Sequence, residues 1–458
     1  MARKDENQWA ASGGSTRHGD PDFFRRFGWF GSLAACSLAL ALTACSQATP
    51  DQQWHPAEQR STLQRNLSPA IPAQDLDQLV ADNSQFAMEL FQQLRAKESN
   101  LFLSPLSISV ALAMTYAGAR GTTAEEIAST LHFDLGQDGL HPAFDQLTLD
   151  LAAAADQARA VDSHFDWSMT NSIWSKPDYP IEQDFLDTLA LDYGTGVYEA
   201  NFDVPQQAAD QINRWIEQET HDRIQDMLDA EALPRTTRLV LVNAIYFNAS
   251  WAQAFDKTNT QNRPFFLFDG SQVDVATMNL VADLRYNEVD GMKVVEFPYK
   301  GNQFSMVVVM PDPAKFDAQV NALDASSLAG LVASLRTKRL DVTLPKTHVE
   351  SKFTLKKVFE TMGMVTPFGD NREVPPDFSG MTTKEELQIQ EVIHQTFLDV
   401  DEEHTEAAGT TVVVMKADAG MGPPPPTPIV VHFDHPFLFF IKDQKTNSIL
   451  FFGQIVQP

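Results

Sequence analysis

The chain has 458 residues, of which 43% are hydrophobic, and this is enough to bury a large core and to exclude a disordered or collagen-like polymer. Lys plus Arg number 34 against 61 Asp plus Glu, so the net charge of −27 argues against nucleic acid as a partner. The two cysteines, Cys36 and Cys45, lie near the start of the chain. A disulfide framework or a cysteine-based zinc site in the body of the protein is therefore excluded.

Residues 1–44 have the pattern of an export signal. Arg25 and Arg26 precede an apolar run over residues 31–42, which is too short to span a bilayer but fits a secretory signal. The run ends in Leu-Thr-Ala-Cys45, which resembles the lipobox of bacterial lipoproteins. This resemblance implies cleavage before Cys45 and lipidation of its sulfur. The alternative is an ordinary signal peptide that happens to end near a cysteine.

The segment after the signal is rich in Gln, Pro, Ser and Ala and has no sustained hydrophobic period. We therefore expect residues 45–74 to be the lipidated cysteine followed by a flexible tether. The protein would be exported and held through its lipid on the outer membrane, in the periplasm or at the cell surface. The globular domain is expected at residues 75–458.

Helical patterns come first in this domain and strand patterns later. Leu79, Phe86 and Leu90 share one helical face, and residues 100–117 predict a second, mostly apolar helix. Strands are predicted at the β-rich runs further along the chain, which are residues 239–247, 306–310 and 396–401 and the hairpin 437–441 with 449–455. This order predicts the α+β class with mixed sheets.

Catalytic signatures are missing from the sequence. It contains no Gly-x-Ser-x-Gly elbow, no His-Glu-x-x-His pair, no Walker loop and no dinucleotide fingerprint. Its eleven histidines are scattered without ligand spacing. We therefore expect no enzyme activity, no metal site and no cofactor.

One segment is unusual because its residues favour both strand and loop. After the strand-like run that ends at Asp401, small and β-branched residues lead to four consecutive prolines, residues 423–426. Small and β-branched residues suit a strand, whereas glycines and a polyproline II stretch favour an exposed loop. Taken by itself, the segment reads as a long proline-rich surface loop.

Four segments, in the same order and with similar separations, resemble motifs of the serpin family. They are residues 100–109, 241–255, 392–411 and 433–439. The resemblance covers residues 75–458 and implies three β-sheets, about eight to nine helices and an exposed reactive loop at about 402–428. It also implies a monomeric suicide inhibitor of extracytoplasmic serine, or cysteine, proteases. The target protease would cleave the loop and stay covalently bound while the loop inserts into the main sheet.

The resemblance assigns a hinge that begins at Glu402. If the hinge enters a sheet as a strand, its alternate side chains face the core. The core-facing side chains would all be small, and they are Thr405, Ala407, Gly409 and Thr411. The opposite face would take Glu406, Ala408 and Thr410. His404 stands where inhibitory serpins usually carry glycine, so the alternative is a non-inhibitory serpin-fold binding or scaffold protein.

The resemblance also implies a cluster that controls opening of the main sheet. Ser104, Ser107, Asn243 and His394 would hydrogen-bond across the strands that part, although Ser104 before Pro105 could simply cap a helix. Trp251 and Phe255 would line the upper entry point, where Lys346 could pair with Glu402.

The scissile bond follows from a count along the loop. About sixteen residues separate the hinge position from this bond in inhibitory members of the family, which gives Asp418–Ala419. The stretch after Ala419 is longer than usual, so the register could slip. Lys416–Ala417 is the alternative and would suit a trypsin-like protease.

Overall fold

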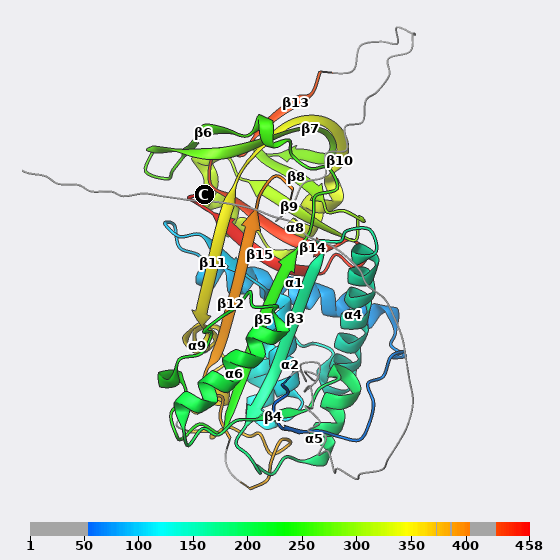
Figure 1. Ribbon diagram of the computed structural model, residues 1–458, viewed down its shortest axis with the longest axis vertical. Helices are drawn as coiled ribbons and strands as arrows, with labels where there is room; N and C mark the ends of the chain where they lie inside the picture. Colours follow the sequence, from blue (N-terminus) through cyan, green and yellow to red (C-terminus); the bar gives the residue numbers. More distant parts are fainter. Residues whose placement is uncertain (1–53, 372, 385–386, 404–426) are drawn as a thin grey trace, which may run out of the picture. The chain divides into compact units, whose positions relative to one another are not determined.

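The computed structural model describes residues 54–371, 373–384, 387–403 and 427–458 (Figure 1). Helix α1 (Ala73–Leu94) buries Leu79, Phe86 and Leu90, as their spacing predicted. Helix α2 (Pro105–Tyr116) is buried along its whole length, and Ser104 caps it by accepting a 3.3 Å hydrogen bond from the Ser107 amide. Proline suits the first helical position because no intrahelical hydrogen bond is lost there.

Nine α-helices are present in the described residues, which agrees with the expected number. The others are α3 (Gly121–Leu131), α4 (Gly136–Arg159), α5 (Gln183–Thr188), α6 (Pro205–Glu219), α7 (Phe316–Ala322), α8 (Ala325–Ser334) and α9 (Lys356–Met362). A π-helical turn, η1 (Leu189–Tyr193), continues α5. None of the helices in this part of the chain is long and apolar enough to cross a bilayer.

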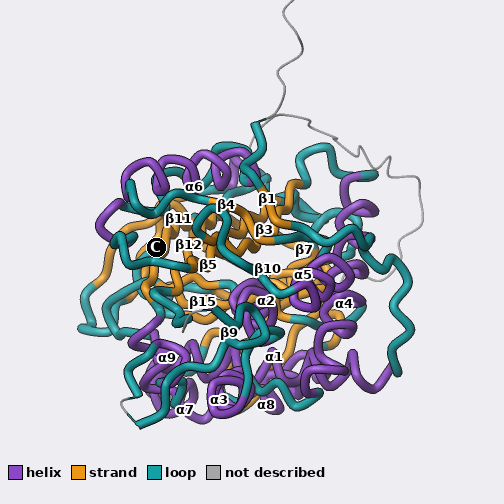
Figure 2. Tube along the Cα trace, turned by 90° about the horizontal axis from the view of Figure 1, so that it is seen from below, coloured by secondary structure: helices purple, strands orange, loops and turns teal. Residues whose placement is uncertain are grey.

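Within the described ranges, the main sheet has six strands in the order β1-β4-β3-β5-β12-β11. The strands are β1 (Glu58–Gln59), β3 (Asp166–Ser175), β4 (Val197–Glu199), β5 (Leu239–Asn248), β11 (Thr347–Thr354) and β12 (Val392–Val400). Helix α6 lies on one side of this sheet, and α1 and α2 lie on the other (Figure 2). Strands β5 and β12 are parallel, whereas each pairs antiparallel with its other neighbour, β3 or β11.

The other strands form a nine-stranded sheet. They are β2 (Leu101–Leu103), β6 (Gln261–Phe266), β7 (Gln272–Val289), β8 (Met292–Pro298), β9 (Phe304–Met310), β10 (Arg336–Pro345), β13 (Ile429–His432), β14 (Phe437–Asp443) and β15 (Ile449–Ile455). Two of the three expected sheets are continuous, because β7 pairs with β6 and β10 and, from Arg285 onward, with β8. The predicted C-terminal hairpin is confirmed as the antiparallel pair β14–β15. The α+β class is also confirmed.

The flexible tether expected for residues 45–74 is wrong from residue 55 onward. Residues 55–72, which we call the strap, lie against the domain, and β1 pairs antiparallel with β4. Arg65 reaches α4, where its Nε lies 2.7 Å from the Asp145 carboxylate, and that side chain is fully buried. A composition typical of a tether was misleading here, because backbone pairing and a few polar side chains hold this segment without any hydrophobic period. Residues 45–53 lie outside the described part of the chain.

We predict that Arg65→Ala destabilises the domain by about 2–3 kcal/mol, because it leaves the buried Asp145 carboxylate without its counter-charge. The control is Lys445→Ala, which removes an exposed ion pair with Asp150 on the same helix and should cost at most about 0.5 kcal/mol. Chemical denaturation of both variants measures the difference. Equal midpoints would show that the Arg65–Asp145 ion pair adds nothing to stability.

Candidate functional site

The parallel pair β5–β12 in the centre of the main sheet is joined over a short distance. Residues 392–396 of β12 are in register with residues 241–245 of β5. Towards its C-terminal end, up to Val400, β12 is in register with β11 on its other side. In the described residues, β5 and β12 therefore pair over their lower parts as drawn in Figure 1 and do not pair near their upper ends at Asn248 and Val400.

Buried polar side chains link the lower halves of these strands to α2. His394 and Asn243 are opposite each other in the register, and His394 Nδ1 lies 2.5 Å from Asn243 Oδ1. His394 Nε2 accepts a 2.9 Å hydrogen bond from the Ser104 amide, so the proton of the neutral ring is on Nδ1. Asn243 Nδ2 in turn donates to Ser107 Oγ and to Asn171 Oδ1 on β3. The structure thus brings together all four residues that the sequence assigned to this cluster.

Burial keeps His394 neutral. Because the ring has no exposed surface, desolvation lowers its pKa to about 3. A second proton on Nε2 would also replace the acceptor of the Ser104 amide with a donor. The hydrogen bonds of the cluster therefore require the neutral form of His394, with its proton on Nδ1.

The second part of the site lies where β12 ends and the predicted hinge begins. Glu402 is 4% exposed, and its carboxylate accepts hydrogen bonds from Lys346 Nζ at 2.9 Å and from Thr260 Oγ1 at 2.6 Å. Burial by itself raises the pKa of Glu402, but these hydrogen bonds outweigh burial and hold the pKa below its ordinary value. The predicted pairing of Lys346 with Glu402 is present.

The backbone around Glu402 is held by the loop that follows β5. The indole Nε1 of Trp251 donates to the Asp401 carbonyl at 2.8 Å, and the Trp251 amide donates to the Glu403 carbonyl at 3.2 Å. The Phe255 amide donates to the Glu402 carbonyl at 2.9 Å. The rings of Trp251 and Phe255 meet edge to face beneath these contacts. Together they fix the direction in which the chain leaves the sheet at Glu403.

A narrow apolar gap lies beneath the upper end of β12. Its lining includes Leu398 and Val400 of β12, Leu344 of β10, Met306 of β9, and Phe437 and Phe439 of β14. No charged side chain is among these residues.

Several predicted site residues lie outside the described part of the chain, and the structure does not place them. They are Cys45, the hinge residues His404, Thr405, Glu406, Ala407, Ala408, Gly409, Thr410 and Thr411, and both candidate reactive bonds, Asp418–Ala419 and Lys416–Ala417. Among the residues that are described, no group of three or more His, Cys, Asp or Glu side chains could hold a metal ion.

The structure adds three polar residues that the sequence analysis missed. Asn171 joins the lower cluster, Thr260 binds Glu402, and Thr396 Oγ1 donates to the Phe102 carbonyl at 2.7 Å. Each is a single polar residue in an ordinary strand or loop sequence. Only the pairing of β3 with β5, which sets Asn171 opposite Asn243, could have indicated the first of them.

Comparisons with known proteins agree on one family. The family model described as Serpin (serine protease inhibitor) matches residues 81–458. An uncharacterized serpin-like protein of Thermococcus kodakarensis is 33% identical over 405 residues, which cover 88% of this chain and 91% of that protein. Human Serpin B3 is 33% identical over 407 residues, which cover 84% of this chain and all of that protein.

A solved structure shares the fold. The crystal structure of a thermophilic serpin, tengpin, in the native state matches with a TM-score of 0.76 at 26% identity. The match covers 88% of this chain and 100% of that chain.

We predict that His394→Gln reduces the loss of stability in acid. The folded pKa of about 3 lies below the ordinary value of 6.5, so between these pH values the unfolded state binds a proton that the folded state excludes. The wild type should therefore lose up to about 1.4 kcal/mol per pH unit more than the variant as the pH falls below about 6.

Denaturation midpoints at pH 7, 6 and 5 measure this difference. The matched control is His348→Gln, which replaces a histidine of β11 that is 60% exposed and lies outside the cluster. Parallel curves for wild type and His394→Gln would contradict the assigned role of this histidine.

Proposed function

The chain belongs to the serpin family, and we propose that it is an inhibitor of extracytoplasmic serine, or cysteine, proteases that traps its target by reactive-loop cleavage and insertion. The observation that carries the proposal is the parallel pair β5–β12, with the hinge attached at its loosely joined upper end. A chain that reverses direction after Glu403 and enters between these strands would run antiparallel to both.

This geometry makes insertion favourable. Antiparallel ladders are slightly more stable per residue than parallel ones, and an inserted strand pairs along both of its edges. Insertion would break the five-residue register between β5 and β12 together with the link from His394 to Asn243. A strand of sixteen residues extends about 50 Å at 3.3 Å per residue, which exceeds the length of the ten-residue β5. More hydrogen bonds would form than are lost.

The hinge composition supports the same proposal. Side chains that enter beside His394 and Asn243 face α2, which is buried along its whole length and leaves little room. Thr405, Ala407, Gly409 and Thr411 are small enough for this face. His404 favours a second candidate function, that of a non-inhibitory serpin-fold binding or scaffold protein, because an imidazole at the point of reversal resists the backbone conformations that glycine allows.

The sequence before the domain supports action at a membrane. The lipobox-like residues 42–45 favour lipidation of Cys45, and the acidic chain has no cationic excess with which to bind anionic lipids. Ser46, the residue after the cysteine, resembles that of lipoproteins sent on to an outer membrane. The proposed inhibitor is therefore an exported monomer held at the cell envelope through its lipid.

We predict an SDS-resistant complex with a protease and a large rise in melting temperature after loop cleavage. Ala407→Arg should abolish both, because its side chain would face α2 on insertion, and the protein should then be cleaved as a substrate. The matched control Ala408→Arg, on the opposite face, should keep both properties. If the cleaved wild-type chain melts at the temperature of the intact chain, the loop does not insert and the proposed inhibitor function is wrong.

Sequencing of the released C-terminal fragment in the same assay identifies the reactive bond. A new N-terminus at Ala419 supports Asp418–Ala419, and one at Ala417 supports Lys416–Ala417. An N-terminus outside residues 415–422 would mean that the loop has been misplaced.

We predict that the mature protein partitions with membranes and that Cys45→Ser releases it, because serine has no thiol to acylate. Cys36→Ser is the matched control, since Cys36 lies in the removed signal and should not affect partitioning. Cell fractionation followed by phase separation in detergent measures both variants. Recovery of wild-type protein in the aqueous phase would exclude the lipid anchor.

A further inference from the structure

The strap, residues 55–72, is attached to the domain at several points. The Glu199 amide donates to the Ala57 carbonyl at 2.8 Å, next to the pairing of β1 with β4. Ser61 Oγ lies 2.5 Å from the Asp187 carboxylate on α5, and Arg65 binds Asp145 on α4. The strap is therefore fixed to three separate elements before the chain enters α1.

Two glycines shape the surface beneath the strap. A Cβ atom on Gly196 would lie 2.3 Å from the Gln59 carbonyl oxygen, so no side chain fits there while the strap is in place. Gly194 has a φ of +70°, and a Cβ there would lie 2.9 Å from Cδ of Arg65. We call the surface around Gly194 and Gly196 the seat of the strap. It leaves room for the strap backbone at Gly196 and for the Arg65 side chain at Gly194.

Strand register places this seat at the end of the main sheet farthest from the hinge. Gln59 is in register with Val197, Val197 with Ile173, and Ile173 with Leu241 near the start of β5. The hinge is held by Trp251, ten residues further along the chain and therefore about 30 Å away at strand spacing. Figure 1 shows β4 and α5 at the lower end of the sheet, while β12 runs towards the upper end.

Few residues remain between the strap and the proposed lipid. Ser46 to Trp54 is nine residues, which reach about 30 Å when fully extended and about 16 Å on average when flexible. A domain of about 400 residues has a radius of gyration of about 21 Å, hence a diameter of about 55 Å. The spacer is too short for the domain to turn its upper end to the membrane while the strap stays bound.

We propose that the strap sets the orientation of the domain on the membrane, with the β4 end towards the bilayer and the opposite end, where Glu402 is held, away from it. The inference rests on the proposed lipid at Cys45. Two leucines of the strap, Leu63 and Leu67, are 41% and 74% exposed, so the strap presents apolar side chains that the lipid headgroup region can accept. A domain tethered by a free segment would have no such preference.

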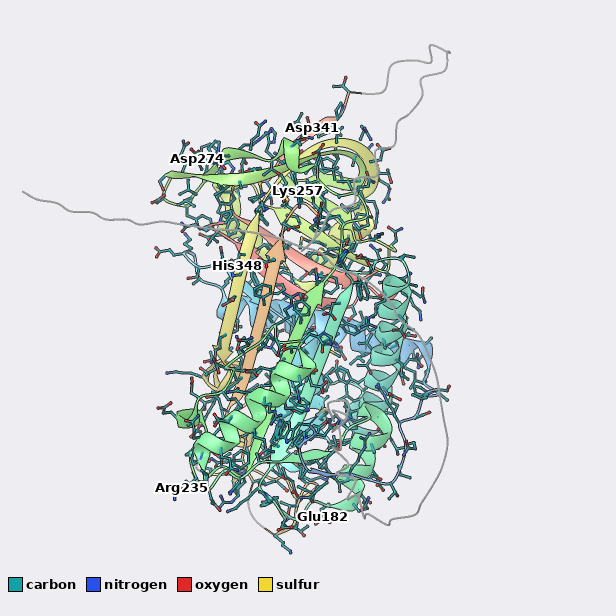
Figure 3. All side chains as sticks on the ribbon, viewed as in Figure 1. Glu182, Arg235, Lys257, Asp274, Asp341 and His348 are labelled. Carbon is teal, nitrogen blue, oxygen red and sulfur yellow. The ribbon has the colours of Figure 1, made fainter. Side chains whose placement is uncertain are left out.

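The test measures how closely each end of the domain approaches lipid. The native membrane form carries a fluorescent label at Arg235→Cys or at Asp274→Cys, two exposed positions at the lower and upper ends (Figure 3). The protein is reconstituted into vesicles that contain a headgroup nitroxide quencher. We expect quenching of the label at residue 235 to exceed that at residue 274 by at least about twofold, because the short spacer holds the lower end near the bilayer.

Two variants show whether the strap is responsible. A twenty-residue Gly-Ser insertion after Ser46 lengthens the spacer, and Ser61→Ala combined with Arg65→Ala weakens the strap; both should reduce the ratio of quenching towards one. Equal quenching of the two labels in the wild type would overturn the inference, as would a ratio that both variants leave unchanged. Vesicle sedimentation is measured in parallel, and failure of the wild type to sediment would overturn the lipid anchor itself.

Discussion

The rest of the structure depends on two parallel strands, β5 and β12, that are joined over only part of their length. Their shared register covers five residues, and the His394–Asn243 contact lies in the middle of it. Each strand has an antiparallel partner on its other side, and both of these pairings are longer, with eight residue pairs between β11 and β12 and ten between β3 and β5. A polypeptide attached at the upper end of β12 could insert between β5 and β12, because it would pair antiparallel with both strands.

Buried polar groups hold β5 and β12 together along this pairing. His394 is kept neutral by burial and links the sheet to the first turn of α2 through the Ser104 amide. Glu402 is held in its ionised form by Lys346 and Thr260 at the upper end. The side chains of both residues are buried and hydrogen-bonded. Any process that separates the strands has to replace these hydrogen bonds. These hydrogen bonds therefore stabilise the closed arrangement of β5 and β12.

The strap is also joined to the main sheet by only a short stretch of strand pairing. Only two residues of β1 pair with β4, yet this covers the edge of the main sheet. Separate polar contacts at Ser61 and Arg65 supply the rest of the attachment. The strap is therefore held by backbone pairing and single polar contacts, and Gly194 and Gly196 leave room for it. It contributes little apolar burial. The main sheet therefore combines a short parallel pairing at its centre with a strand added at the edge beside β4.

The sequence by itself determined the α+β class and the helices and strands with strong hydrophobic periodicity, because periodicity records burial. Its resemblance to serpins supplied the identities of Ser104, Ser107, Asn243 and His394. Tertiary structure decided what depends on register between distant segments. Asn171 and Thr260 became part of the site through the strands and loops opposite them. The strap also escaped prediction, because its contacts are backbone pairing and single polar side chains, and neither leaves a period in the sequence.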